Sequence, residues 1–206
     1  MNEGYSQVLG AISSSSPTPG GGSVAALALA HAHSLALMVA RLTLAREKWS
    51  EGHSAAESVI SFSESGVGFA LNLAENDAHA FDDVMSAYRL PKGDDSEISV
   101  RKDAIRIATL GAAAVPEETA SAAVKFLESI VDLAMFGNIN AMTDLAASAE
   151  LANTATNIAA MNVKINLDSL QGKEAEQMAV RLDGLLVTSN DFIETIRSIV
   201  SERLGW

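Results

Sequence analysis

The segment Pro17–Val24 reads Pro-Thr-Pro-Gly-Gly-Gly-Ser-Val and opens a long alanine-rich stretch. Its prolines fix an extended approach, and its glycines allow a ligand to reach the main chain. Ser23 is a residue type that caps helix N-termini, so we expect it to cap a helix there. Such a helix start presents free N–H groups and a partial positive charge, which suit an anion such as a carboxylate or phosphate. The plain alternative is a tight turn between two helices.

Asp77 is a carboxylate on an apolar helix face. It follows Leu73 by four residues and precedes Phe81 by four, so helical geometry places it in their stripe. Asp82 and Asp83 fall on other faces. A buried carboxylate is costly unless it is paired or used, and its pKa rises easily. Asp77 is therefore a candidate acid–base group, and the alternative is a structural carboxylate bonded to a neighbouring helix or a basic side chain.

Further polar residues interrupt the apolar pattern downstream. Asp144 resembles Asp77 in its setting, because Ser148 and Leu151 share its helix face. Amides recur in the same part of the chain, at Asn138, Asn140, Asn153, Asn157, Asn162 and Asn166. Such groups need partners inside the protein or a ligand that uses them. We interpret most of these amides as helix caps or interhelical hydrogen bonds.

The histidines do not form a metal-binding pattern. His31 shares a helix face with Leu27 and Leu35, which predicts a buried imidazole with a hydrogen-bond partner. His33 points about 200° away from His31 on a helix, so the two cannot bind one metal ion together. His79 is expected to be exposed. The sequence contains no cysteine and no Glu-x-x-His motif, and we predict no metal.

Composition narrows the partners that the protein can have. The 206 residues are 48% hydrophobic but only 5% aromatic, so the core must consist largely of small aliphatic side chains. A net charge of −12 disfavours nucleic acids and anionic membranes, and we expect neither as a partner. The nearly uncharged stretch Val24–Ala40 is short for a spanning helix, so we interpret it as a buried helix. Met1–Ile12 lacks the pattern of a signal peptide, and we expect a cytoplasmic protein.

Nearly every segment has the periodicity of a helix. Pro116 is expected to end one helix and begin the next, and Gly137-Asn138 to stop that one. The segment 161–167 alternates like a strand but has no partner strand, so we interpret it as a helix end or an extended linker. The helices are expected at about 5–12, 23–46, 55–88, 97–115, 116–136, 139–160 and 172–203, with a loop at 89–95. These elements predict an all-α fold, a single-domain bundle of long, alanine-rich helices over residues 1–206.

Taken in order, these residues resemble the signature of the formiminotransferase-cyclodeaminase C-terminal domain and of free-standing methenyltetrahydrofolate cyclohydrolases. The resemblance covers essentially the whole chain. The matching segments are Pro17–Val24, Asp77–Phe81, Tyr88–Lys92, Ala114–Pro116, Gly137-Asn138 with Asp144 downstream, and Asn162–Leu167. Thr143 departs from the usual serine but keeps the hydroxyl. Lys164 departs from an apolar residue and could alter the charge near a substrate.

The resemblance implies an all-helical homodimer with a folate site in a groove at the interface. Asp77 matches the aspartate regarded as catalytic, and Asp144 is a second candidate for a catalytic role. Asn138 and Asn162 match other recurrent polar positions, which we expect to contact substrate. The residues of the loop expected to line the site are Pro19, Gly20, Gly21, Gly22 and Ser23.

The implied activity is hydrolysis of methenyltetrahydrofolate to formyltetrahydrofolate, with no cofactor beyond the tetrahydrofolate substrate. The sequence shows no fused formiminotransferase domain, which favours this cyclohydrolase reaction. The alternative is a formimidoyltetrahydrofolate cyclodeaminase, which releases ammonia and forms methenyltetrahydrofolate. A second alternative is a helical dimer that binds folate without turnover or serves as a scaffold.

Overall fold

A computed structural model describes residues 3–206, and every regular element within that range is helical. The α-helices are α1 (Glu3–Ile12), α2 (Gly21–Leu44), α3 (His53–Tyr88), α4 (Asp95–Ser129), α5 (Val131–Phe136), α6 (Met142–Leu167) and α7 (Lys173–Leu204). Two 3-10 helices, η1 (Glu47–Gly52) and η2 (Ile139–Ala141), lie in the connections. The predicted all-α fold is confirmed.

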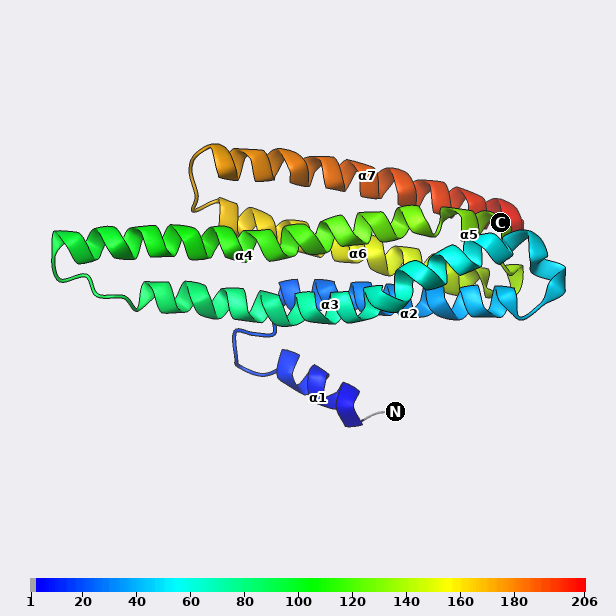
Figure 1. The fold of residues 1–206 in the computed structure, drawn as a ribbon, viewed down its shortest axis with the longest axis horizontal. Helices are drawn as coiled ribbons and strands as arrows, with labels where there is room; N and C mark the ends of the chain where they lie inside the picture. Colours follow the sequence, from blue (N-terminus) through cyan, green and yellow to red (C-terminus); the bar gives the residue numbers. More distant parts are fainter. Residues whose placement is uncertain (1–2) are drawn as a thin grey trace.

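Four helices form the centre of the bundle, as Figure 1 shows. Helix α2 packs on α3 and α6, and α4 packs on the same two helices, so the four close into a ring. Helix α7 covers α6 and α4, whereas α1 lies apart from the bundle with no buried residue. The hairpin of α3 and α4 extends well past the N-terminus of α2. The beginning of α2 therefore lies inside the bundle, beside the flanks of longer helices.

Small side chains allow these helices to approach closely. Thirteen residues of α2 are buried, and alanine is the commonest among them. The Ser148 hydroxyl of α6 donates a hydrogen bond to the Ala32 carbonyl of α2 at 2.8 Å, which joins the two central helices. Close packing of small residues thus takes the place of a core built on aromatic side chains.

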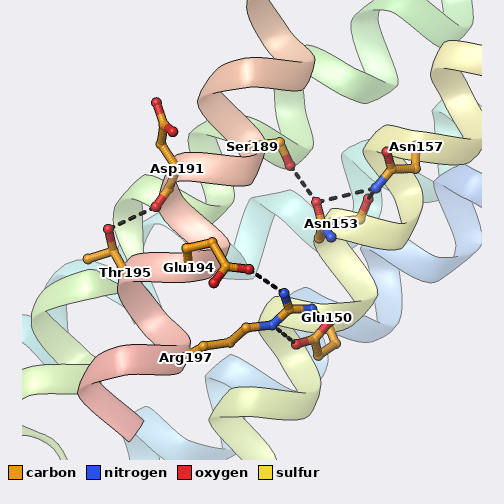
Figure 2. A network of polar contacts seen from close by, with 8 residues as sticks. All are labelled: Glu150, Asn153, Asn157, Ser189, Asp191, Glu194, Thr195 and Arg197. Carbon is orange, nitrogen blue, oxygen red and sulfur yellow. Dashed lines mark hydrogen bonds and ion pairs between the residues drawn. The ribbon is translucent and has the colours of Figure 1, made fainter. Parts of the chain in front are cut away.

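Polar residues join α6 to α7 along one side of the bundle (Figure 2). The Oδ1 atom of Asn153 accepts hydrogen bonds from Ser189, at 3.0 Å, and from Asn157, at 3.3 Å. One turn away, Arg197 pairs with Glu150 and Glu194. Asn153 and Asn157 are therefore structural, as the interpretation of most amides as caps or interhelical bonds requires.

Pro116 does not divide its helix, and the sequence prediction of a new helix there is wrong. Helix α4 continues through Pro116 and ends at Ser129, so the break comes at Ile130 instead. A proline lacks the N–H that would bond the carbonyl four residues earlier, here that of Ala112. Asn166 of α6 supplies the missing donor, with its Nδ2 at 3.0 Å from the Ala112 oxygen. Segment 161–167 is the end of α6 and fully helical.

The predicted burial of His31 is wrong, and the buried histidine of α2 is His33. His31 is exposed, where it meets the ring of Tyr5 from α1, and His33 is buried. The Nδ1 atom of His33 bonds the Ser63 hydroxyl at 3.0 Å, and its ring packs edge-on against Phe126. The prediction failed because Leu27 and Leu35, which share the face of His31, are themselves only partly buried. His79 is exposed, as predicted.

Among residues 3–206, α2 is the one helix long and apolar enough to cross a membrane by length and composition. This test alone is weak evidence for a membrane span, because a helix at the centre of a folded core passes it too. Most of the apolar window of α2 is buried by the other helices of the bundle.

Burial of His33 makes the stability of the fold depend on pH. Desolvation lowers the pKa of His33 to about 4, whereas an unfolded chain protonates this group near 6.5. The folded protein is therefore unaffected above pH 6.5 and loses free energy of unfolding as the pH falls toward 4. We expect this loss to reach about 3 kcal/mol.

Chemical denaturation of the wild-type protein and of His33→Asn between pH 7 and pH 4 measures this contribution. The variant is expected to show a shallower loss of stability on acidification. His31→Asn is the matched control on the exposed side of the same helix, and its pH dependence should equal that of the wild type. Parallel profiles for the wild type and His33→Asn would contradict the assignment.

Candidate functional site

The glycine loop leads directly into α2. Gly20 is the N-cap in an extended conformation, with φ −112° and ψ −156°, and the helix begins at Gly21. The predicted cap by Ser23 is wrong, because Ser23 lies inside the first turn and α2 has no side-chain cap from its own N-cap residue. Pro19 and Gly20 are partly buried beside this turn. The first-turn N–H groups of a helix have no intrahelical partner, so they point toward the loop and its neighbours.

Ser23 instead bonds the carboxyl group of Asp77. Its hydroxyl donates to Oδ2 of Asp77 at 2.9 Å, which joins α2 to α3 across 54 residues of sequence. Asp77 is half-buried on the face of α3 that also holds Leu73 and Phe81, as predicted, whereas Asp82 is exposed. Desolvation raises the pKa of Asp77, and the Ser23 hydroxyl and backbone N–H oppose part of that rise.

Gly22 is a glycine because Asp77 occupies the space of a side chain. A Cβ atom at position 22 would lie 2.1 Å from Oδ1 of Asp77 and 2.6 Å from its carboxyl carbon. Atoms at such distances overlap, so any larger residue would displace the carboxyl group. The triple glycine predicted that a ligand could come close to the main chain. At Gly22 the group that lies against the main chain is instead the Asp77 side chain of the protein itself.

Asn162 reaches the same turn from α6. A Cβ atom at Gly21 would lie 3.2 Å from Nδ2 of Asn162, so the carboxamide lies directly against the first turn of α2. Its Nδ2 donates to the Ile158 carbonyl at 2.9 Å, within its own helix. The structure therefore brings Asp77 and Asn162, which are far apart in sequence, against two consecutive glycines of the loop.

Asn138 and Asp144 lie at the other end of the bundle. The backbone N–H of Asn138 donates to Thr43 at 3.0 Å and its Nδ2 to the Leu42 carbonyl at 3.3 Å, so it binds the C-terminus of α2. Along α2 this end is about 33 Å from Gly21, at 1.5 Å a residue. Asp144 is partly buried at the start of α6, about 27 Å from Asn162 by the same rise. Within one chain these two residues do not join the loop.

Asn166 is the residue that sequence reasoning left without a specific role. It lies one turn beyond Asn162 and joins α6 to α4 through the Ala112 carbonyl. A signal was present, because Pro116 within a helical pattern implies an unpaired carbonyl at Ala112 that some donor must satisfy. The sequence did not show which helix would provide that donor.

A separate cavity of about 800 Å³ lies between α3 and α4. His33 forms part of its wall, together with Phe62, Phe69 and Lys125. Gly66 makes room for the imidazole, because a Cβ atom there would lie 2.3 Å from Cε1 of His33. The cavity is thus built around a buried histidine for which the sequence analysis predicted no burial.

The arrangement at the loop can perform acid–base chemistry on a cation. A half-buried carboxyl group with a raised pKa can accept and return a proton, and its ionised form stabilises positive charge nearby. Free N–H groups at the start of α2 can bind an acceptor on the same ligand. Among residues 3–206 no group of three or more His, Cys, Asp or Glu side chains is placed to hold a metal ion.

Fold and site together define a helical protein whose acid–base carboxyl group lies at a glycine-rich helix start. The sequence model of the formiminotransferase-cyclodeaminase family matches residues 5–182, and the chain belongs to this family. The family expected from the sequence is therefore confirmed.

Three relatives show how far the similarity extends. The methenyltetrahydrofolate cyclohydrolase of Methylorubrum extorquens is 32% identical over 209 residues, which is 99% of each chain. The rat formimidoyltransferase-cyclodeaminase is 31% identical over 66% of this chain, which corresponds to 25% of that longer protein. The crystal structure of formiminotetrahydrofolate cyclodeaminase from Thermotoga maritima superposes with a TM-score of 0.79 at 26% identity, covering 97% of this chain and 94% of the other.

Replacement of Gly22 tests the contact between the loop and Asp77. We expect Gly22→Ala to lower the free energy of unfolding by about 1–3 kcal/mol, because the added methyl group overlaps the carboxyl group. Gly68→Ala is the matched control, since a Cβ atom in that helical position meets nothing within 4 Å. The control should be about 0.5–1 kcal/mol more stable than the wild type, as alanine is the better helix former. Thermal unfolding measures both, and equal effects would refute the contact.

Proposed function

We propose that the protein hydrolyses methenyltetrahydrofolate to formyltetrahydrofolate. The observation on which the proposal rests is the half-buried Asp77 carboxyl group held against the glycine-rich start of α2 by Ser23. The Methylorubrum relative named for this reaction is similar over the full length of the chain, which supports the choice of substrate. A cytoplasmic protein without nucleic-acid or membrane partners fits the net charge of −12 and belongs to the same proposal.

The chemistry follows from the charge of the substrate. The methenyl bridge is an amidinium-like cation, and an ionised Asp77 beside it stabilises that charge. Asp77 accepts a proton from the water that adds to the bridge carbon, and it then returns the proton to the ring nitrogen as the carbon–nitrogen bond breaks. The second proton of the water goes to solvent, and the product is the neutral formyl group. Desolvation raises the pKa of Asp77, which makes its carboxylate a stronger base than an ordinary aspartate for the first of these transfers.

A cyclodeaminase is the second candidate. The Thermotoga structure and the rat protein, both named for that activity, favour it. In that reaction a nitrogen of the substrate attacks the formimino carbon, and Asp77 would protonate ammonia as it leaves. The two reactions require the same carboxyl group in the same place, so their substrates and not the site distinguish them.

A homodimer would complete the site, and we include it in the proposal. Helices α2 and α6 lie together on the side of the bundle away from α3 and α4 (Figure 1). Both expose apolar side chains, Met38 and Leu42 near the end of α2 and Met161 and Ile165 near the end of α6. Helices α2 and α6 run in opposite directions. An antiparallel pair of chains would therefore place Met38 and Leu42 of one chain against the Met161–Ile165 segment of its partner. Two such self-complementary patches suit a two-fold interface.

The dimer assigns a place to Asp144 and Asn138. Both lie at the end of the bundle that holds Met38 and Leu42, and Asp77 lies at the end that holds Met161. In an antiparallel dimer the Asp144 of one chain therefore approaches the glycine loop of the other. A site of this kind contains an acid–base group from one chain and a second carboxylate from its partner.

Assays with purified protein distinguish the functions. Loss of methenyl absorbance with methenyltetrahydrofolate supports the cyclohydrolase, and release of ammonia from formimidoyltetrahydrofolate supports the cyclodeaminase. Folate binding without either reaction would indicate a binding protein or scaffold and would refute both enzymatic proposals.

Asp77→Asn is expected to lower kcat by about 10²-fold or more, because the amide keeps the shape of the side chain but cannot take up a proton. The pKa of Asp77 lies above its ordinary value of 3.8, so protonation removes the base as the pH falls through that raised value. The wild type should therefore lose kcat/KM on the acid side, and Asp77→Asn should not show this limb. Asp82→Asn, on the exposed face of the same helix, is the control that should keep wild-type rates. Near-wild-type turnover by Asp77→Asn would exclude the mechanism.

Mixed dimers test the shared site. Asp77→Asn and Asp144→Asn are each expected to be inactive, and a mixture after subunit exchange should recover about a quarter of wild-type activity, because half of the dimers then contain one intact site. Light scattering on each sample tests whether dimers are present throughout. If both carboxylates belonged to one chain, the mixture would stay inactive, and a monomeric protein would refute the dimer itself.

A further inference from the structure

The contact between Asn166 and α4 begins with a defect in the backbone of α4. Pro116 is buried in the middle of α4 and has no N–H, so the carbonyl of Ala112 lacks its normal helical partner. Nδ2 of Asn166 donates to that oxygen at 3.0 Å and also to the Asn162 carbonyl of its own helix at 2.9 Å. One amide group thus satisfies a carbonyl on each of two helices.

The position of Asn166 connects this defect to the glycine loop. Asn162 lies one turn earlier on α6, with its carboxamide 3.2 Å from where a Cβ of Gly21 would be. Gly21 is in turn adjacent to Gly22, which lies against Asp77. The last turns of α6 are therefore fixed to α4 on one side and touch the start of α2 on the other.

We propose that Asn166 is a positioning residue for the site. By bonding the carbonyl that Pro116 leaves open, it sets the place of α6 against α4 and so holds the Asn162 carboxamide against Gly21. Proline and asparagine act as a pair, since the proline leaves open an acceptor in α4 that the asparagine of α6 satisfies. The effect on turnover depends on the proposed function, whereas the coupling between Pro116 and Asn166 does not.

A double-mutant cycle tests the pair without any assay of activity. Asn166→Ala is expected to lower the equilibrium constant for folding about tenfold, because the Ala112 carbonyl loses its donor. Pro116→Ala provides an N–H within α4, so in that background Asn166→Ala should cost no more than about threefold. An equal cost in both backgrounds would overturn the coupling.

The chemical shifts of the Gly21 and Gly22 amides report on the positioning role. These signals should move in Asn166→Ala and should remain moved in the double variant, because restoring the bond within α4 does not restore the link to α6. Asn157→Ala is the matched control, since Nδ2 of Asn157 bonds only within α6. It should leave both glycine signals in place. Unmoved signals in Asn166→Ala would show that Asn166 is structural only.

Kinetics with methenyltetrahydrofolate give a third readout. We expect Asn166→Ala to raise KM about tenfold with kcat within about threefold, because Asp77 and Ser23 keep their own bond. In the double variant the folding equilibrium constant should lie within about threefold of that of Pro116→Ala, whereas KM should stay as high as in Asn166→Ala. Recovery of KM together with stability would overturn the positioning role. Absence of turnover in the wild type would refute the proposed function, and the cycle and the glycine signals would still decide the inference.

Discussion

The burial of one carboxyl group at the start of α2 constrains the whole site. Desolvation disfavours the charged form of Asp77, and the hydroxyl and N–H of Ser23 partly offset that cost. This geometry requires a residue without a side chain at position 22, since the carboxyl atoms already fill that space. Helix α2 also begins without a side-chain cap from its N-cap residue, and Asp77 accepts from the backbone N–H of Ser23 in its first turn. The glycine loop and the aspartate are thus two parts of one arrangement.

Polar groups elsewhere in the bundle hold the two ends of α2. Asn162 touches its N-terminal turn, and Asn138 bonds the carbonyl and hydroxyl groups at its C-terminus. Arg203 of α7 fixes the adjoining turn by donating to the carbonyls of Ala134 and Gly137. Most of the buried residues of α2 are small, so few large side chains fix its register against its neighbours. Directional hydrogen bonds at its ends provide that register instead.

A hydrogen bond between helices also explains how a proline is accommodated within α4. Pro116 leaves the Ala112 carbonyl open, and the Asn166 amide closes it from another helix. An interior proline normally destabilises a helix because an acceptor is left unpaired and the ring crowds the preceding turn. Here the unpaired acceptor becomes an attachment point between α4 and α6, next to the residues that form the site.

The sequence by itself determined the all-α fold, most helix boundaries, and the choice of Asp77 and of the glycine loop as candidate site residues. Those features are local, because periodicity, glycine and proline signals, and the setting of a carboxylate on an apolar face are written within one or two turns. Only the tertiary structure decided the rest. It placed His33 rather than His31 in the core, turned Ser23 from a cap into a partner of Asp77, and joined Pro116 to Asn166. Each of these depends on which helix packs on which face, and in an alanine-rich helix nearly every face is apolar enough to be buried.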